Sequence, residues 1–313
     1  MNFDYKSTRK WLLDSNACDR CLGRQFHNLF KADNGDIGWA VRLCESLEEV
    51  QKKISLGRPK PKLTKDCPFC EGLFFKVEEA ARRVVELTAN YEYDTFLIGV
   101  KVPERLIVRE EKMWSEIGAV HCEPLKKDLK RQIGLKVEAQ TGKKVDFKNP
   151  DILAVVDLSF EKPRVKLEVH PIYIYGKYRK LVSGIPQTKW YCPHCQGKGC
   201  EKCNFTGKLY EESVEELIAD GIVGEAGGRG EKFHGSGRED VDAKMLGWRP
   251  FVLEILEPVK RHLDLKTLEK KINKGGKVEV KGLRPSNKEE VEFIKAVKYD
   301  KTYELLVQCE ETI

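Results

Sequence analysis

Long hydrophobic runs are missing from this sequence. No window approaches the ~18 consecutive apolar residues that mark a membrane-spanning helix, so we expect no membrane span and no membrane partner. The N-terminus, from Met1 to Lys6, lacks the charged and then apolar pattern of a secretory signal. We therefore expect a cytoplasmic protein with reduced thiols, in which paired cysteines bind a metal instead of forming disulfides.

Nucleotide-binding loops are also missing. The sequence contains no Gly-x-Gly-x-x-Gly and no Walker-type loop. Its one glycine-rich stretch, Gly227 to Gly230, has no apolar strand before it that could present phosphate-binding amides. These absences argue against an enzyme that depends on a nucleotide or a methyl donor.

Positive charge is in moderate excess. The 313 residues suffice for two or three domains, and the 41% that are hydrophobic can bury a sizeable core. The net charge of +6 favours an anionic partner such as nucleic acid. Basic runs lie at Lys60 to Lys65, Lys126 to Arg131 and Lys177 to Lys180. Each is ordinarily a solvated surface, and for Lys126 to Arg131 an RNA contact is an equal alternative.

The eleven cysteines fall mainly into two sets of four. The compact set has two residues inside each pair, so both thiolates of a pair can reach one ion, and two pairs complete the tetrahedron that zinc prefers. Its spacing favours a zinc knuckle over chance. Of the remaining cysteines, Cys44 lies on a predicted helix, where we expect it to be buried. The compact set is Cys192, Cys195, Cys200 and Cys203.

A long insertion splits the other set, so its pairing is an inference. The pairs Cys18/Cys21 and Cys67/Cys70 are each followed by a glycine and an aromatic residue, which suggests two halves of one site. Neither set leaves an open coordination position, so both are predicted to be structural zinc sites. His194 lies within the compact set, where four thiolates already suffice.

Periodicity indicates an α+β chain. Apolar spacing predicts a helix over 36–54, a loop over 57–65 and further helices over 77–87, 126–133 and 265–272. Capping patterns start two more helices, at Ser213 with Glu216 and at Ser286 with Glu289, the second running through Val297. Predicted strands cover 95–100, 151–158, 165–175 (beside the preceding strand), 251–255, 277–280 and 303–307.

The segment Gly237 to Asp242 carries three carboxylates and an arginine on a predicted loop. Glycines permit tight turns, and an apolar strand follows at Phe251, so this loop is expected beside a rigid sheet, where catalytic groups are usually carried. By residue type alone, a solvated surface loop is the commoner case. Asp240 and Asp242 are rival carboxylates, and a lone histidine such as His234 is more often structural.

Several segments together resemble parts of one known family. The segments 18–24 and 67–72 resemble its cysteine knuckles, and 150–153 with 173–178 resemble its THUMP-type RNA-binding domain. The segments 184–190, 212–218 and 233–251 resemble its catalytic domain. The similarity is specific and covers nearly the whole chain, and the family that it indicates is the archaeal and eukaryotic tRNA pseudouridine synthases that are tenth in the usual naming.

The resemblance implies that the chain isomerises uridine to pseudouridine in the T-loop of tRNA, at uridine 54 with uridine 55 as a second candidate. Asp240 would be the catalytic aspartate, and Arg238 the motif arginine beside the displaced nucleotide. Tyr303 would be the aromatic that stacks on the extruded base, although its alternation with Leu305 and Val307 also suits a core or edge aromatic. The implied partner is tRNA, with the protein acting as a monomer and zinc as its only cofactor.

The resemblance also implies a multi-domain layout. We expect a zinc-knuckle helical region over 1–75, a THUMP-like α/β domain over 76–176 and a pseudouridine synthase catalytic domain over 177–313 with a mixed or antiparallel sheet. Family members continue beyond Val307, so we expect a catalytic domain incomplete at its C-terminus or completed by a second polypeptide. The expected consequence is a chain that binds tRNA but isomerises uridine poorly.

Two alternatives stay open. One is another THUMP-type tRNA-modifying enzyme, such as a methyltransferase or a thiouridine synthase. The other is a non-catalytic, zinc-dependent RNA-binding module, because the pattern from Cys192 to Gly199 also occurs in such modules.

Overall fold

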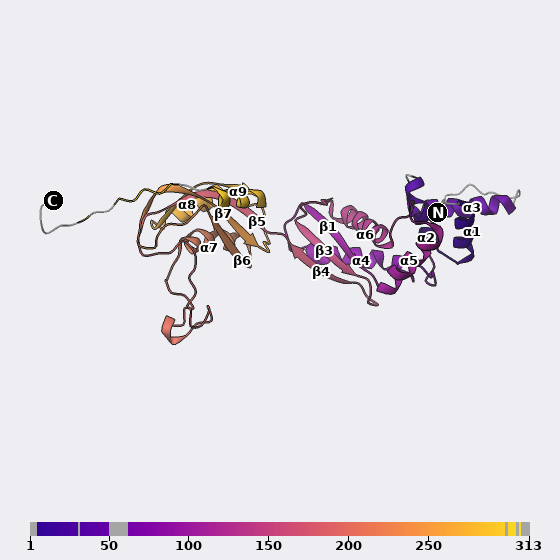
Figure 1. The fold of residues 1–313 in the computed structure, drawn as a ribbon, viewed down its shortest axis with the longest axis horizontal. Helices are drawn as coiled ribbons and strands as arrows, with labels where there is room; N and C mark the ends of the chain where they lie inside the picture. Colours follow the sequence, from indigo (N-terminus) through magenta and orange to yellow (C-terminus); the bar gives the residue numbers. More distant parts are fainter. Residues whose placement is uncertain (1–4, 31, 50–61, 298–299, 305–306, 308–313) are drawn as a thin grey trace. The chain divides into compact units, whose positions relative to one another are not determined.

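The computed structural model describes residues 5–30, 32–49, 62–297, 300–304 and 307, and it divides into two compact units, Met1–Glu168 and Val169–Ile313 (Figure 1). Each unit contains helices and one four-stranded sheet, which confirms the α+β, multi-domain prediction. Within the described ranges, no helix has the length and apolar character that crossing a membrane requires.

Short helices form the first part of the first unit, as predicted. They pack so closely that two glycines have no room for a side chain. A β-carbon on Gly23 would lie 1.8 Å from the carbonyl oxygen of Asn34, and one on Gly38 would lie 1.8 Å from the carbonyl oxygen of Asp19. Residues 50–54 of the predicted helix and 57–61 of the predicted loop lie outside the described ranges. Cys44 is exposed, so its predicted burial is wrong. The helices are α1 Tyr5–Asp14, α2 Asp19–Gly23, η1 Arg24–Leu29, α3 Asn34–Glu49 and η2 Leu73–Lys76.

The first sheet has the strand order β2-β1-β3-β4, and β1 pairs in parallel with both neighbours. Alternate residues of β1 and β3 are buried, although the sequence of β3 is a nearly continuous apolar run. Gly134 of α6 lies over Ile98 of β1, so α6 covers this buried face. The elements are α4 Val77–Thr88, β1 Thr95–Lys101, α5 Glu104–Ile117, α6 Leu125–Thr141, β2 Lys144–Val145, β3 Ile152–Asp157 and β4 Arg164–Val169.

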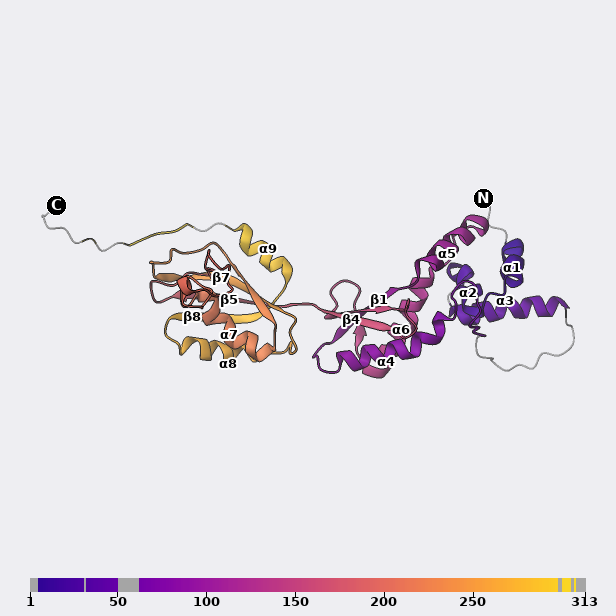
Figure 2. The same ribbon diagram turned by 90° about the horizontal axis from the view of Figure 1, so that it is seen from below.

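The second sheet is antiparallel, with the order β6-β7-β5-β8. Figure 2 shows α7 and α8 on one side of this sheet and α9 on the other. The main core lies on the α7 and α8 side, and Val252 packs with α9 on the opposite side. The elements are β5 Ile172–Lys180, η3 Glu201–Cys203, α7 Val214–Ala226, β6 Gly230–Gly235, β7 Met245–Leu256, α8 Leu265–Asn273, β8 Val278–Ser286 and α9 Lys288–Ala296.

The predictions for two strands and one helix cap differ from the structure. The predicted strand 165–175 is two strands in different units, because β4 ends at Val169 and β5 begins at Ile172. Tyr303, Glu304 and Val307 have no strand pairing, so the final strand is absent from these three residues, whereas residues 305 and 306 are not described. The cap of α9 is Asn287, whose side chain accepts from the amide of Glu290, one residue later than predicted. The cap of α7 at Ser213 is confirmed.

Candidate active site and cysteine sites

The charged loop connects β6 to β7 and spans residues 236–244. Asp240 is exposed on it, and the hydroxyl of Tyr303 donates to Asp240 Oδ2 over 2.9 Å. This hydrogen bond, with the negative charge of Asp240, raises the pKa of Tyr303. Lys301 Nζ donates to the carbonyl oxygen of Arg238 over 2.9 Å, so the chain after α9 lies against the loop at two points.

The three residues assigned to catalysis by resemblance therefore lie in one place. Tyr303 is 53% exposed, which excludes the alternative of a core aromatic. Arg238 is exposed and takes part through its backbone carbonyl. An exposed carboxylate beside an exposed phenol ring can contact a ligand from solvent. The Tyr303 hydroxyl donates to Asp240 and not to the rival carboxylate of Asp242.

A buried lysine supports the loop from below. Lys180, the last residue of β5, is 0% exposed, and its ammonium donates to three backbone carbonyl oxygens. Two belong to the loop, those of Asp240 at 2.8 Å and Val241 at 3.0 Å, and the third is that of Ile185 at 3.0 Å. Burial lowers the pKa of Lys180, while the nearby carboxylates oppose that shift. The sequence run 177–180 was interpreted as a solvated surface, and for Lys180 that interpretation is wrong.

Glu239 forms a second support. Its side chain is buried, Oε2 accepts from the hydroxyl of Tyr178 at 2.7 Å, and Arg249 Nε lies 3.3 Å from the same oxygen. Gln187 Nε2 donates both to the Tyr178 hydroxyl, at 2.7 Å, and to the carbonyl oxygen of Gly237, at 2.9 Å. Burial and the charge of Glu239 raise the pKa of Tyr178, which keeps the phenol protonated as a donor.

These supporting residues have no assigned role in the sequence analysis. For two of them, Tyr178 and Lys180, the sequence held a signal: both lie an even number of residues after Ile174, so on a regular strand all three side chains point to the same buried face. His234 lies on β6, not on a loop, and its Nε2 is 2.9 Å from Glu254 Oε2, which suits a structural histidine. The glycine-rich stretch ends α7, with Gly227 as its left-handed cap.

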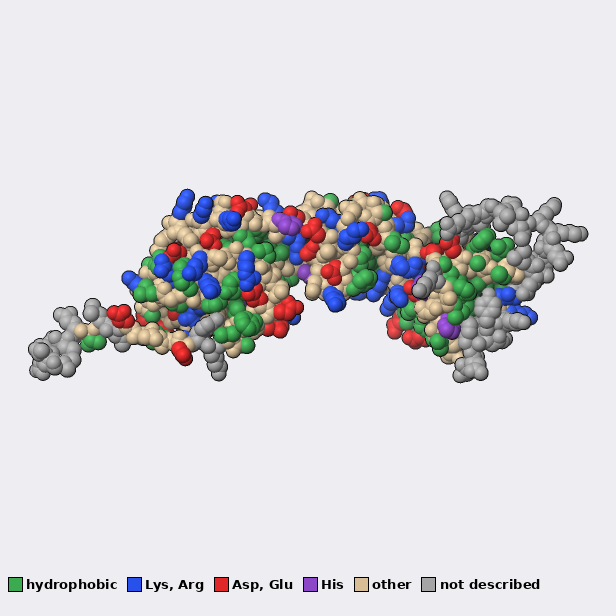
Figure 3. Space-filling view, turned by 90° about the horizontal axis from the view of Figure 1, so that it is seen from above, with side chains coloured by type: hydrophobic (Ala, Val, Ile, Leu, Met, Phe, Trp, Pro, Cys, Tyr) green, Lys and Arg blue, Asp and Glu red, His purple; other side chains and the backbone are tan. Residues whose placement is uncertain are grey.

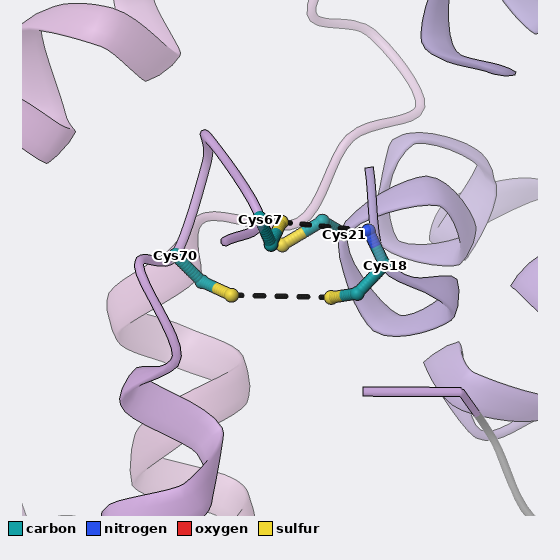
Figure 4. A group of neighbouring side chains, drawn as sticks. All are labelled: Cys18, Cys21, Cys67 and Cys70. Carbon is teal, nitrogen blue, oxygen red and sulfur yellow. Dashed lines mark hydrogen bonds between the residues drawn. The ribbon is translucent and has the colours of Figure 1, made fainter. Parts of the chain in front are cut away.

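The split cysteine set is assembled in the first unit. Figure 4 shows Cys18 and Cys21 facing Cys67 and Cys70, and all four sulfur atoms lie within 4.8 Å of one another. Cys18 Sγ is 3.9 Å from Cys70 Sγ, close to the ~3.8 Å edge of a tetrahedron with zinc–sulfur bonds of about 2.3 Å. The donors are buried, so the set can hold a metal ion.

Charged residues of the same motif anchor this site. Arg20 is buried and donates to Asp128 of α6 and to Asp33. Arg24, also buried, forms an ion pair with Glu110 of α5. A buried charge is stable only when it is paired, so these arginines fix the first cysteine pair to the helices beside the first sheet. The arginines of this motif therefore have a structural function.

The compact set is assembled in the second unit. The sulfur distances are 3.9 Å between Cys192 and Cys200, 3.8 Å between Cys195 and Cys203, and 3.7 Å between Cys200 and Cys203. Burial opposes ionisation of Cys203, but the amides of Cys200 and Gly207 donate to its sulfur and lower its pKa to about 6. These distances and the favoured thiolate suit a tetrahedral metal ion.

Comparison with known proteins identifies the family of the chain. The family model described as "Pus10, C-terminal" matches residues 173–313, and the one described as "Pus10 THUMP domain, archaeal" matches residues 80–157. The tRNA pseudouridine synthase Pus10 of Methanothermobacter marburgensis is 40% identical over 310 residues, covering 96% of this chain and 73% of that protein. The chain belongs to the Pus10 family.

Other Pus10 proteins show the same extent of similarity. The tRNA pseudouridine synthase Pus10 of Methanopyrus kandleri is 39% identical, covering 92% of this chain and 70% of the relative. The tRNA pseudouridine synthase Pus10 of Methanocaldococcus jannaschii is 37% identical, covering 99% of this chain and 72% of that relative. The loop with Asp240 lies within the residues that the C-terminal family model matches.

Proposed function

We propose that this chain is a tRNA pseudouridine synthase that isomerises uridine in the T-loop, at uridine 54 with uridine 55 as a second candidate. The observation that carries the proposal is the contact between the exposed Asp240 carboxylate and the Tyr303 hydroxyl on a loop fixed from beneath. Family membership supports the reaction, because the curated relatives are named for it.

The chemistry assigns a role to each residue. In the isomerisation, the C1′–N1 bond of one nucleotide breaks, a C1′–C5 bond forms, N1 gains a proton and the C5 proton is released. Asp240 would be the carboxylate held against the ribose and base while these bonds exchange. Tyr303 would stack on the base once it has left the tRNA stack, a step that costs a few kcal/mol. Arg238 would contact the displaced nucleotide.

The remaining parts would bind and position tRNA. In this proposal, residues 1–75 are the zinc-knuckle region, 76–176 the THUMP-like domain and 177–313 the catalytic domain. The exposed Lys126, Lys127 and Lys130 on α6 would contact the phosphate backbone. The proposal takes the protein to be a cytoplasmic monomer without an organic cofactor.

The proposal is tested by single-turnover modification of an unmodified tRNA transcript labelled with tritium at C5 of uridine. We expect tritium release with the chain in excess, and transcripts with cytidine at position 54 or 55 identify the modified nucleotide. Release that persists in a transcript with cytidine at both positions would place the modification outside positions 54 and 55 and would contradict the proposal. Tight tRNA binding with no release would support the alternative of a non-catalytic RNA-binding module.

Zinc is the proposed occupant of both cysteine sets. We expect two zinc ions per chain by metal analysis, and one after Cys200→Ser. The segment 190–209 contributes no residue to the main core cluster of the second unit, so this variant should change the thermal midpoint by no more than about 2 °C, less than 1 kcal/mol.

The matched variant is Cys67→Ser, which should also retain one zinc ion. Cys67 is 0% exposed and its site joins two segments that are distant in the sequence, so this variant should lower the midpoint by more than Cys200→Ser does. Two zinc ions in either variant would contradict the assignment of ligands.

A further inference from the structure

One part of the second sheet places cations around two half-buried aromatic rings. On β5, Ile174 and Tyr178 point into the main core, so the alternate residues Lys177 and Arg179 lie on the opposite face. Trp248 of β7 joins them there: its ring centroid is 5.0 Å from the Arg179 guanidinium carbon. The α9 helix packs on Val252 and Tyr175 of this face. The cations lie on the same face, beyond the part that α9 covers.

A bulge in β8 adds two more cations to the same face. Lys281 and Arg284 are three residues apart, and in a regular strand they would point to opposite faces. Here Lys281 pairs with Lys177 and Arg284 with Tyr175, so Gly282 and Leu283 together oppose one residue of β5. Gly282 has φ +68°, the left-handed conformation typical of the first residue of such a bulge.

The bulge therefore places Leu283 on one face of the sheet and both Lys281 and Arg284 on the other. Leu283 packs against the main core, whereas Arg284 lies over the Tyr175 ring at 4.2 Å and Lys281 over the Trp248 ring at 4.0 Å. We call this surface the basic-aromatic face. It consists of Tyr175, Lys177, Arg179, Trp248, Lys281 and Arg284.

The charge of this face is not balanced within the sheet. Glu279 pairs with Arg179 and Glu290 pairs with Arg284, so four cations and two carboxylates leave two positive charges. Lys177 stands directly opposite Lys281, and like charges in that position destabilise a sheet. Both lysines are exposed, so an anion from solvent can relieve their repulsion.

The combination identifies the kind of anion. Cations alone would suit any phosphate, but flat rings held on a rigid sheet between cations are the elements with which proteins bind the backbone and bases of RNA. Figure 3 shows Lys and Arg side chains gathered on the second unit, with hydrophobic side chains among them. We propose that the basic-aromatic face is a docking surface for the sugar-phosphate backbone of the tRNA substrate, an inference that rests on the proposed function.

The test is the salt dependence of tRNA binding, measured by fluorescence anisotropy between 50 and 300 mM KCl. The double variant Lys177→Gln/Lys281→Gln should reduce the slope of log K against log salt by about 1.4–1.8, the contribution of two phosphate contacts. The control is Lys266→Gln/Lys270→Gln, which removes two exposed lysines from α8. Equal changes in both double variants would overturn the proposal, because general charge would then explain the effect.

Further readouts separate this inference from the proposed function. The variant Lys177→Gln/Lys281→Gln should unfold at the same or a slightly higher temperature, since a repulsion is removed. Trp248→Ala should weaken tRNA binding severalfold. If wild-type chain releases tritium but the double variant keeps its salt slope, the docking surface is wrong and the function stands. If the slope falls but wild-type chain forms no pseudouridine, the surface stands and the function is wrong.

Discussion

Replacing Asp240 by asparagine is expected to lower the single-turnover rate of tritium release by about 10³-fold, within the range lost when a reacting carboxylate is removed. Asparagine has the same shape and keeps an oxygen that can accept from the Tyr303 hydroxyl, so the loop should stay in place. The tRNA affinity should therefore change by less than about twofold, because one exposed charge contributes little to binding. Rate and affinity are measured on the same labelled transcript.

Neighbouring residues supply the controls for this result. Asp242→Asn removes a carboxylate from the same loop and should leave the rate close to that of the wild-type chain. Tyr303→Phe removes one hydrogen bond of about 1 kcal/mol and should slow the reaction about fivefold. If Asp242→Asn abolished release and Asp240→Asn did not, the two carboxylates would have to exchange roles.

Local patterns predicted those parts of the fold that local interactions determine. The helix α4 and the strands β1 and β3 were predicted within one or two residues, because α4 has an amphipathic period and each strand is a short apolar run. The two cysteine sets were predicted from spacing, since a metal constrains the positions of its ligands more strictly than packing constrains apolar residues. The placement of Asp240 on a loop beside a sheet was confirmed for the same kind of reason, because glycines precede it and an apolar strand follows.

The features that failed depend on partners far away in the sequence. Apolar residues recur on both sides of Pro171, so 165–175 was predicted as one strand; the proline marks the break, but it does not show that β4 joins one sheet and β5 another. In the sequence, Glu239 resembles its exposed neighbours. In the structure it is buried, because its carboxylate accepts from the hydroxyl of Tyr178 on β5 and pairs with Arg249 on β7. The bulge at Gly282 changes which residues share a face, and only the pairing with β5 reveals it.

Lys180→Met is expected to slow single-turnover release about 100-fold, the loss that a displacement of about 1 Å can cause at a reacting group. Methionine fills much of the same volume but leaves the carbonyl oxygens of Ile185, Asp240 and Val241 without the ammonium donor. Hydrogen bonds to a charged group contribute about 1.5–3 kcal/mol each, and release of the buried charge offsets part of their loss. We therefore expect the free energy of unfolding to fall by about 1–3 kcal/mol, measured by urea denaturation.

Two readouts distinguish a positioning role for Lys180 from general destabilisation. First, Lys266→Met, an exposed change on α8, should leave the rate, the tRNA affinity and the unfolding free energy unchanged. Second, burial lowers the pKa of Lys180, so the wild-type rate should decline as the pH rises, at pH values below the usual pKa range of lysine.

The effect of this group on stability has the opposite sign. Between the pKa of Lys180 in the folded state and its pKa in the unfolded chain, the unfolded state binds more protons, so this group makes the folded state more stable as pH rises. The alkaline decline would thus reflect a neutral amine, with two hydrogens for three carbonyls, and not unfolding. A flat alkaline profile in the wild-type chain, or a Lys180→Met variant as fast as wild type, would show that the loop does not depend on this ammonium.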